Sequence, residues 1–171
     1  MTVDTPQFLA RYNSQANAAM NQVLASLTPQ EWEAPRGGYF PSFRALTGHL
    51  YTADIQWLVR FSALRPFKTV KGDPFDFPPS WDKQPFGGVD EYLSLRVPLD
   101  AALIAFTGEL TDEDLRSDLE YRSSSGKAYT KNFGGLVLHL FNHQTHHRGA
   151  IALYLDQLGK ANDFSNISAV L

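Results

Sequence analysis

The chain has 171 residues, 43% of them hydrophobic, which is enough for one domain with a sizeable buried core. It contains no cysteine, so disulfides, thiolate metal ligands and a cysteine nucleophile are excluded. A formal net charge of −3 without a basic stripe argues against nucleic acid as a partner, and no apolar run reaches the roughly 20 residues that span a bilayer. We therefore expect a single cytoplasmic domain over residues 1–171, with no membrane partner.

Two long amphipathic helices are predicted in the first third of the chain. Apolar residues recur every three or four positions over residues 5–27 and again over 43–64, and Ser42 precedes the second run as an N-cap. A Thr-Pro pair at 28–29 predicts a short capped helical turn between the two helices, followed by a loop over residues 34–41.

The connection from Arg65 to Gly88 is unusually long for a compact domain and holds five of the ten prolines. Its aromatic residues are Phe67, Phe75, Phe77, Trp81 and Phe86. Such side chains favour a segment that packs against the body of the protein over one that stays in solvent. Two interpretations remain open: a packed crossover connection, which is the commoner case, and a lid over a substrate site.

The second half of the chain predicts two more long helices with a small β-hairpin between them. The first runs over residues 89–110, and Pro98 inside it should kink or split the helix because proline lacks the backbone N–H donor. Residues 118–122 and 127–131 alternate with a period near two around a Ser-Ser-Ser-Gly turn, which predicts the hairpin. The second helix is expected over residues 133–158.

Four long helices of this kind predict an all-α protein. The expected architecture is a four-helix bundle with a long connection between its second and third helices and the hairpin before its fourth. Metal sites in such bundles are built from side chains on facing helices, so the distribution of the histidines becomes important.

Four of the five histidines fall within the fourth predicted helix. The full set is His49, His139, His143, His146 and His147. Residues four apart lie above one another on a helix, so His139, His143 and His147 form one column. With a rise of about 1.5 Å per residue, His139 and His147 are roughly 12 Å apart, too far to share an ion at Zn–N distances of about 2.0–2.1 Å. Either His139 with His143, or His143 with His147, can therefore share a metal.

A third nitrogen ligand would have to come from another helix, and His49 is the one histidine outside the cluster. It lies at the edge of the apolar stripe of the second predicted helix. A single buried histidine is usually only a hydrogen-bonded core residue, and one pair at this spacing is weak evidence by itself. The clustering, the helical spacing and the separate core-facing histidine together favour a metal site. His146 points about 100° away from His147 and is expected at a surface or an interface.

The histidine motif resembles that of a known family. Gly48-His49-Leu50, followed far downstream by Leu138-His-Leu-Phe-Asn-His-Gln-Thr-His-His-Arg-Gly149, is similar to the DinB family, and the likeness extends over nearly the whole chain. It implies a four-helix bundle with a divalent metal, typically zinc or nickel, held by His49, His143 and His147. His139 then lies one turn away as a neighbour.

Three neutral imidazoles leave at least one coordination position open, which is typical of a catalytic zinc site. The resemblance implies an enzyme that acts on a small-molecule substrate, and a low-molecular-weight thiol bound as thiolate would make it a thiol-dependent S-transferase. The alternatives are a metal-dependent hydrolase and a non-catalytic metal-binding stress-response protein. The resemblance also implies a homodimer, for which Met20 and Val23 on the first helix offer a face.

Asp54 and Asn142 are candidates for an outer hydrogen bond to a ligand histidine, but neither lies beside the ligand on the same helix face, so this role is the less favoured alternative. Tyr154 lies two turns beyond His147 on the same face and could line the pocket, although core packing is the commoner role. Arg148 is expected to form an ion pair with Asp100 or Glu109. Gly149 is expected to permit the close approach of another helix.

Overall fold

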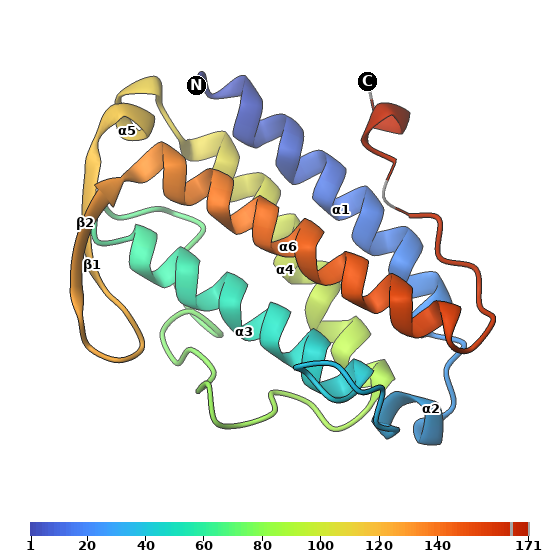
Figure 1. Ribbon diagram of the computed structural model, residues 1–171. Coiled ribbons are helices and arrows are strands. Elements are labelled where there is room, and N and C mark those ends of the chain that lie inside the picture. Colours follow the sequence, from blue (N-terminus) through green and yellow to red (C-terminus); the bar gives the residue numbers. More distant parts are fainter. Residues whose placement is uncertain (165, 171) are drawn as a thin grey trace.

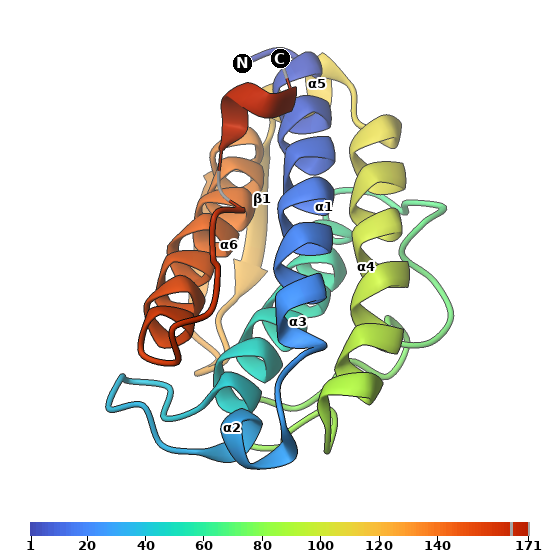
Figure 2. The ribbon, with the colours of Figure 1, turned by 90° about the vertical axis from the view of Figure 1, so that its right-hand side faces the viewer.

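Four long helices form the body of the protein in the computed structural model, which describes residues 1–164 and 166–170. These helices are α1 (Asp4–Leu24), α3 (Phe43–Phe61), α4 (Val89–Glu109) and α6 (Phe133–Asp156). α1 packs against α4 and α6, and α3 packs against the same two helices, so the four close into a ring (Figures 1 and 2). The predicted all-α four-helix bundle is confirmed.

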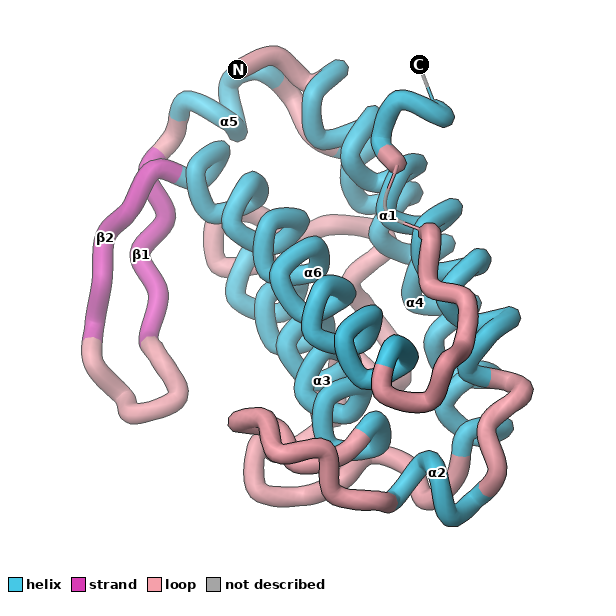
Figure 3. The backbone as a smooth tube through the Cα atoms, turned by 45° about the vertical axis from the view of Figure 1, so that its right-hand side comes forward, coloured by secondary structure: helices cyan, strands magenta, loops and turns pink. Residues whose placement is uncertain are grey.

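Short elements connect the long helices at the two ends of the bundle. They are α2 (Pro29–Glu33), α5 (Asp112–Arg116) and the strands β1 (Asp118–Arg122) and β2 (Ala128–Asn132). The 3-10 helix η1 (Ile167–Val170) follows α6. β1 and β2 pair antiparallel with Glu120 opposite Thr130, which confirms the predicted hairpin. The hairpin extends away from the helices at the end where α5 lies (Figure 3).

The two helices that carry the histidines are capped at their starts. Ser42 Oγ accepts a hydrogen bond from the Ala45 N–H at 3.2 Å before α3, and Asn132 Oδ1 accepts one from the Gly135 N–H at 2.9 Å before α6. Each cap satisfies a donor that has no partner inside the helix. Gly159 has a φ of +64° after the end of α6, a left-handed conformation that glycine adopts readily.

Pro98 lies within α4, which runs without interruption from Val89 to Glu109. Of the two predicted outcomes, a kink or a split, the split is wrong. Proline removes one backbone hydrogen bond, but Pro98 is on the exposed side of α4, where water can satisfy the freed carbonyl group.

The exposure of α1 differs from the prediction that Met20 and Val23 offer a face for a second copy. Met20 is 1% exposed and belongs to the core, so it offers no contact to a second copy, while Val23 is only partly buried.

Within the described part of the chain, no helix combines the length and the apolar character needed to cross a membrane.

The connection between α3 and α4 packs against the bundle through some of its aromatic residues and exposes others. Phe67 contacts Phe106 with ring centroids 4.9 Å apart, and Phe86 contacts Tyr92 at 5.2 Å. Phe77 and Trp81 remain at the surface, 82% and 42% exposed. The packed part fixes the course of the connection past the amino-terminal half of α3, where His49 lies.

Candidate metal centre

Three histidines from two helices converge at one point between α3 and α6. His143 Nε2 lies 3.0 Å from His49 Nε2 and 3.0 Å from His147 Nε2. Nitrogen atoms bound to one tetrahedral zinc ion at about 2.0–2.1 Å lie roughly 3.4 Å from one another, so the two distances to His143 are close to those at a shared cation. The three candidate ligand atoms all lie within 4.8 Å of one another. We call these three residues the histidine triad. Among the described His, Asp and Glu residues, they form the group whose ligand atoms lie close enough together to hold one metal ion.

The other two histidines lie outside this cluster. His139 is exposed, with its ring centroid 6.0 Å from that of His143 and 5.3 Å from that of Trp57. His146 is also exposed, and its ring packs beside that of His147. Of the two pairs that helical spacing left open, the one that meets His49 is His143 with His147.

Burial keeps the rings of the triad neutral. Burial is the main cause, and repulsion between like charges on neighbouring imidazoles adds to it; together they lower the pKa of His143 to about 3 and that of His147 to about 4. Burial also lowers the pKa of His49. His143 Nδ1 is buried without a hydrogen-bond partner in the described chain. A proton on Nδ1 leaves the Nε2 lone pair directed at the other two rings, the form that binds a metal.

Phe40 covers the triad on one side. Its ring stacks on His49 with centroids 4.3 Å apart and meets His147 edge-on at 5.5 Å. Tyr154 Oη donates a hydrogen bond of 2.7 Å to the Phe40 carbonyl oxygen, which fixes the loop that carries this ring. A Cβ atom on Gly38 would lie 1.9 Å from Tyr154 Oη, so the loop reaches this position only with glycine there. Tyr154 therefore positions Phe40 and does not line the pocket.

A cavity of about 80 Å³ opens beside His49 on the other side of Phe40. It is lined by Phe40, Ala45, Gly48, His49, Thr52, Trp81, Lys83 and Gln84. The connection comes this close to α3 because residue 48 is glycine: a Cβ there would lie 2.3 Å from Gln84 Oε1 and 3.3 Å from Pro85 Cδ. In the motif Gly48-His49, the histidine is the candidate ligand and the glycine lets the connection pack beside it to form a wall of the cavity.

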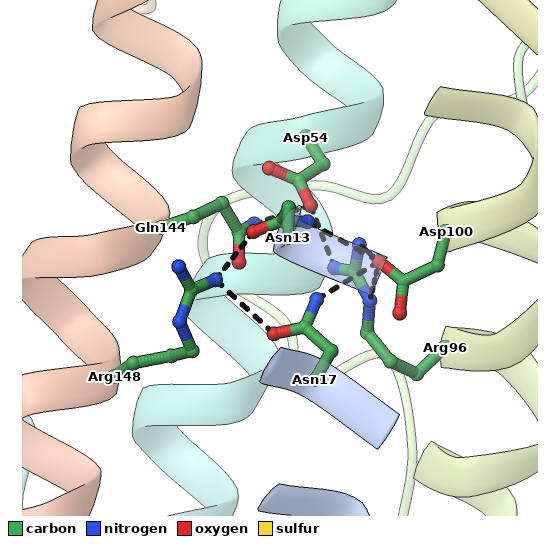
Figure 4. A network of polar contacts seen from close by, with 7 residues as sticks. All are labelled: Asn13, Asn17, Asp54, Arg96, Asp100, Gln144 and Arg148. Atoms are coloured by element: carbon green, nitrogen blue, oxygen red, sulfur yellow. Dashed lines mark hydrogen bonds and ion pairs between the residues drawn. The ribbon is translucent and has the colours of Figure 1, made fainter. Parts of the chain in front are cut away.

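A buried polar network joins all four long helices next to the triad (Figure 4). Its members are Asn13, Asn17, Asp54, Arg96, Asp100, Gln144 and Arg148. Arg96 donates to Asp54 at 2.6 Å and also pairs with Asp100, and Gln144 donates to Asp54. Burial raises the pKa of Asp54, and the charge of Arg96 opposes that rise. Asp54 forms no hydrogen bond with a described histidine, so it does not take the outer role for which it was the less favoured candidate.

The predictions for the residues around Arg148 are also wrong. Arg148 donates to Asn13, to Asn17 at 3.3 Å and to Thr145 at 3.2 Å, and forms no ion pair with an acid of the described chain. Asn17 in turn donates to Asp100 at 2.8 Å, so the acid expected as a direct partner is reached through an amide.

Two further predicted roles are absent on the exposed side of α6. The Asn142 side chain is exposed and forms no hydrogen bond with any described residue. Gly149 is also exposed, and a Cβ there would meet no described atom of another segment within 4 Å, so no helix approaches closely at that point.

The sequence did not identify Phe40 as part of the site, because nothing in its sequence position reveals that a loop folds back over α3.

Comparison with known proteins gives consistent results. The model of the DinB family matches residues 1–167. Protein DinB of Bacillus subtilis (strain 168) is 27% identical over 155 residues, which cover 90% of this chain and 86% of that protein. A solved DinB-like protein from Bacillus cereus has a TM-score of 0.62 and 20% identity, and covers 91% of this chain and 93% of its own.

A second solved structure, YfiT from Bacillus subtilis, has a TM-score of 0.66 and 16% identity. The match covers 94% of this chain and 91% of YfiT. YfiT is described as a probable metal-dependent hydrolase with an unusual four-helix bundle topology. At these identities the two solved structures establish a shared fold.

Proposed function

Because this chain belongs to the DinB family, we propose that it is a metal-dependent enzyme in which His49, His143 and His147 hold one divalent cation. The observation that carries the proposal is the convergence of three neutral imidazole nitrogens, with both Nε2–Nε2 distances to His143 at 3.0 Å. An all-imidazole set suits zinc or nickel among the common divalent metals, and it leaves a coordination position for a small molecule.

A divalent cation bound by the triad would supply Lewis acidity and would lower the pKa of a water or thiol that it binds. The protein's own side chains complete the site. Phe40 restrains the rings of His49 and His147 by stacking, and together with Trp81 it offers apolar surface on two sides of His49. Lys83 and Gln84 supply polar groups to the cavity beside them.

We favour a thiol-dependent S-transfer reaction over hydrolysis. Among the described residues that line the cavity beside His49, none is a carboxylate that could act as a general base toward water. A thiol has a free pKa of about 8.5, against about 15.7 for water, so it would release its proton to solvent at neutral pH on binding a cation and needs no such base. Hydrolysis is the second candidate, because the similar structure YfiT is described as a probable metal-dependent hydrolase.

The first experiment is elemental analysis of the untagged protein, with His147→Ala and His146→Ala as a matched pair of neighbours. We expect about one equivalent of metal in the wild type and in His146→Ala, and almost none in His147→Ala, because only His147 points into the triad. Full metal content in His147→Ala would contradict the proposed ligands. Metal-free, fully folded wild-type protein would favour a non-catalytic role.

The second experiment distinguishes the two reactions with cobalt-substituted protein. A small thiol that binds at the cation should produce a sulfur-to-metal charge-transfer band, and His49→Ala should remove it. If no thiol changes the spectrum while an activated ester is turned over, hydrolysis replaces S-transfer as the proposed reaction.

A further inference from the structure

Arg60 on α3 is held between two tryptophan rings. Its guanidinium carbon Cζ lies 5.0 Å from the ring centroid of Trp57 and 6.0 Å from that of Trp81. Trp57 precedes it on the same helix, and Trp81 comes from the long connection. Stacking on aromatic faces orients a guanidinium group and leaves its N–H donors free at the edge. We call these three residues the Arg60 clamp.

Arg60 differs from the other arginines that are at least partly buried in the described chain. The remaining five, all of which donate hydrogen bonds to protein groups, are Arg36, Arg44, Arg65, Arg96 and Arg148. The described residues provide no hydrogen bond and no ion pair for the Arg60 guanidinium. Asp82, the acid next to Trp81 in the chain, accepts its hydrogen bond from Ser80. Burial also lowers the pKa of Arg60, as expected for a cation without a compensating charge.

The Arg60 clamp lies close to the histidine triad. Arg60 follows His49 by eleven residues, which is about three helical turns and places both side chains on nearly the same face of α3. Trp81 contacts both groups, with its ring centroid 5.8 Å from that of His49 and 6.0 Å from Arg60 Cζ. These two distances limit the separation of the His49 ring from the guanidinium to about 12 Å.

A second row of rings connects the clamp to the triad along α6. Trp57 packs against His139 with centroids 5.3 Å apart, and His139 lies 6.0 Å from His143. Tyr121 of the hairpin closes the far side of Trp57 at 5.5 Å. Planar side chains therefore connect the triad with Arg60 by two routes, one through Trp81 and one through His139 and Trp57. Both routes end at the positively charged N–H donors of the Arg60 guanidinium.

We propose that Arg60 binds a carboxylate or another planar anionic group of the substrate whose reacting atom lies at the histidine triad. This proposal rests on the proposed function and defines its substrate class. The substrate is a small organic anion whose length suits the separation, at most about 12 Å, between the His49 ring and the Arg60 guanidinium, with an apolar spacer that lies along Trp81. Arg60 is a positioning residue, because a guanidinium can hold a carboxylate through two parallel hydrogen bonds.

The test compares two thiols of equal length on cobalt-substituted protein, 6-mercaptohexanoate and 6-mercaptohexanol. We expect the wild type to bind the acid about tenfold more tightly than the alcohol, which is the scale of one partly exposed charged contact. Arg60→Gln should remove this preference by weakening the acid alone. Arg60→Lys should retain part of it, because the charge remains and the paired donors are lost.

Lys71→Gln is the matched control, since it removes one positive charge from an exposed position of the same connection. It should leave the preference for the acid unchanged. If Lys71→Gln abolishes the preference, or if Arg60→Gln preserves it, the assignment to Arg60 is overturned. Metal content and far-UV circular dichroism of each variant show that the bundle and the triad are intact.

A second readout separates this inference from the proposed reaction. Suberate, a dicarboxylate that can bridge a cation and Arg60, should quench the fluorescence of Trp57 and Trp81 in the zinc-loaded wild type and not in Arg60→Gln. Trp32 is 1% exposed and contributes a constant background. If no thiol binds but suberate gives this difference, the S-transfer proposal fails and the Arg60 assignment stands. Equal responses of the two proteins to suberate overturn the assignment whatever the reaction.

Discussion

The neutral state of His143 and His147 in the folded protein has a measurable consequence at low pH. The pKa values of about 3 and about 4 lie below the value of roughly 6.5 expected in the unfolded chain. Below pH 6.5 the unfolded chain therefore binds more protons than the folded one, and protonation favours unfolding. The penalty is absent at pH 7 and grows until the pH reaches the folded-state values.

We predict that the free energy of unfolding of the metal-free protein falls between pH 7 and pH 5. After allowance for solvent screening, each of the two histidines should contribute roughly 1 kcal/mol to this loss. Urea titrations at several pH values measure it. In His143→Leu the fall should be smaller than in the wild type, whereas His146→Leu should show the full fall; a pH-independent wild type would contradict the neutral triad.

Among the elements, the short helix α5 is tied to the rest of the chain by one carboxylate. Asp114 accepts hydrogen bonds from the Thr111 N–H at 2.8 Å and from the Arg65 guanidinium at 2.8 and 2.9 Å. The hydrogen bond with Arg65 is the main cause of the lowered pKa of Asp114. α5 leads directly into the hairpin and then into α6, so this carboxylate anchors the segment before the histidine helix.

We predict that Asp114→Asn lowers the free energy of unfolding at pH 7 by about 1–2 kcal/mol, the usual effect of losing a cap together with a charged contact. Because the folded-state pKa is depressed, the contribution is complete above the unfolded value near 3.9 and is lost as the pH falls through the folded value. The difference from the wild type should therefore shrink below pH 4. Glu113→Gln, an exposed neighbour on α5, should have no such effect, and equal stabilities of Asp114→Asn and wild type at pH 7 would contradict the anchoring role.

Local patterns predicted the elements well because helices and strands are set by neighbouring residues. The predicted cap at Ser42 and the period of apolar residues place α3 and α6 within a few residues of their predicted ends. Helical spacing also limited the candidate metal pair to two choices. To choose between the two pairs from geometry, one must know how far α3 is shifted along the axis of α6. That shift is set by the packing of the whole bundle.

Partners across the bundle were the part that sequence could not predict. Arg148 was expected to pair with an acid, yet the residues that face it are two asparagines of α1. Phe40, Trp81 and Arg60 approach the triad from a loop, a long connection and a distant turn of α3. Trp81 was predicted only as one aromatic residue of a connection that packs on the protein, and nothing in the local sequence singles out Phe40 or Arg60, because these roles depend on which segments meet in three dimensions.

For the whole molecule, the buried network of Arg96 connects the four long helices at their centre. Arg96 and Asp54 are almost completely buried, with side chains 1% and 0% exposed. We predict that Asp54→Asn lowers the free energy of unfolding by about 3 kcal/mol, because it leaves the buried guanidinium with one acid fewer. Urea unfolding at pH 7 measures the change. Asp90→Asn, which replaces an exposed acid at the start of α4, should change stability by less than about 0.5 kcal/mol.

The same network limits how the helices can slide along one another. In a bundle with a wholly apolar core, α3 could shift by one turn along α6, and His49 would then meet His139 and His143. Here that shift would separate Asp54 from Gln144 and from Arg96, leaving the buried Asp54 carboxylate without its partners. The buried polar network thus sets the position of α3 along α6, and the position that satisfies its polar groups is the one in which the three imidazoles meet.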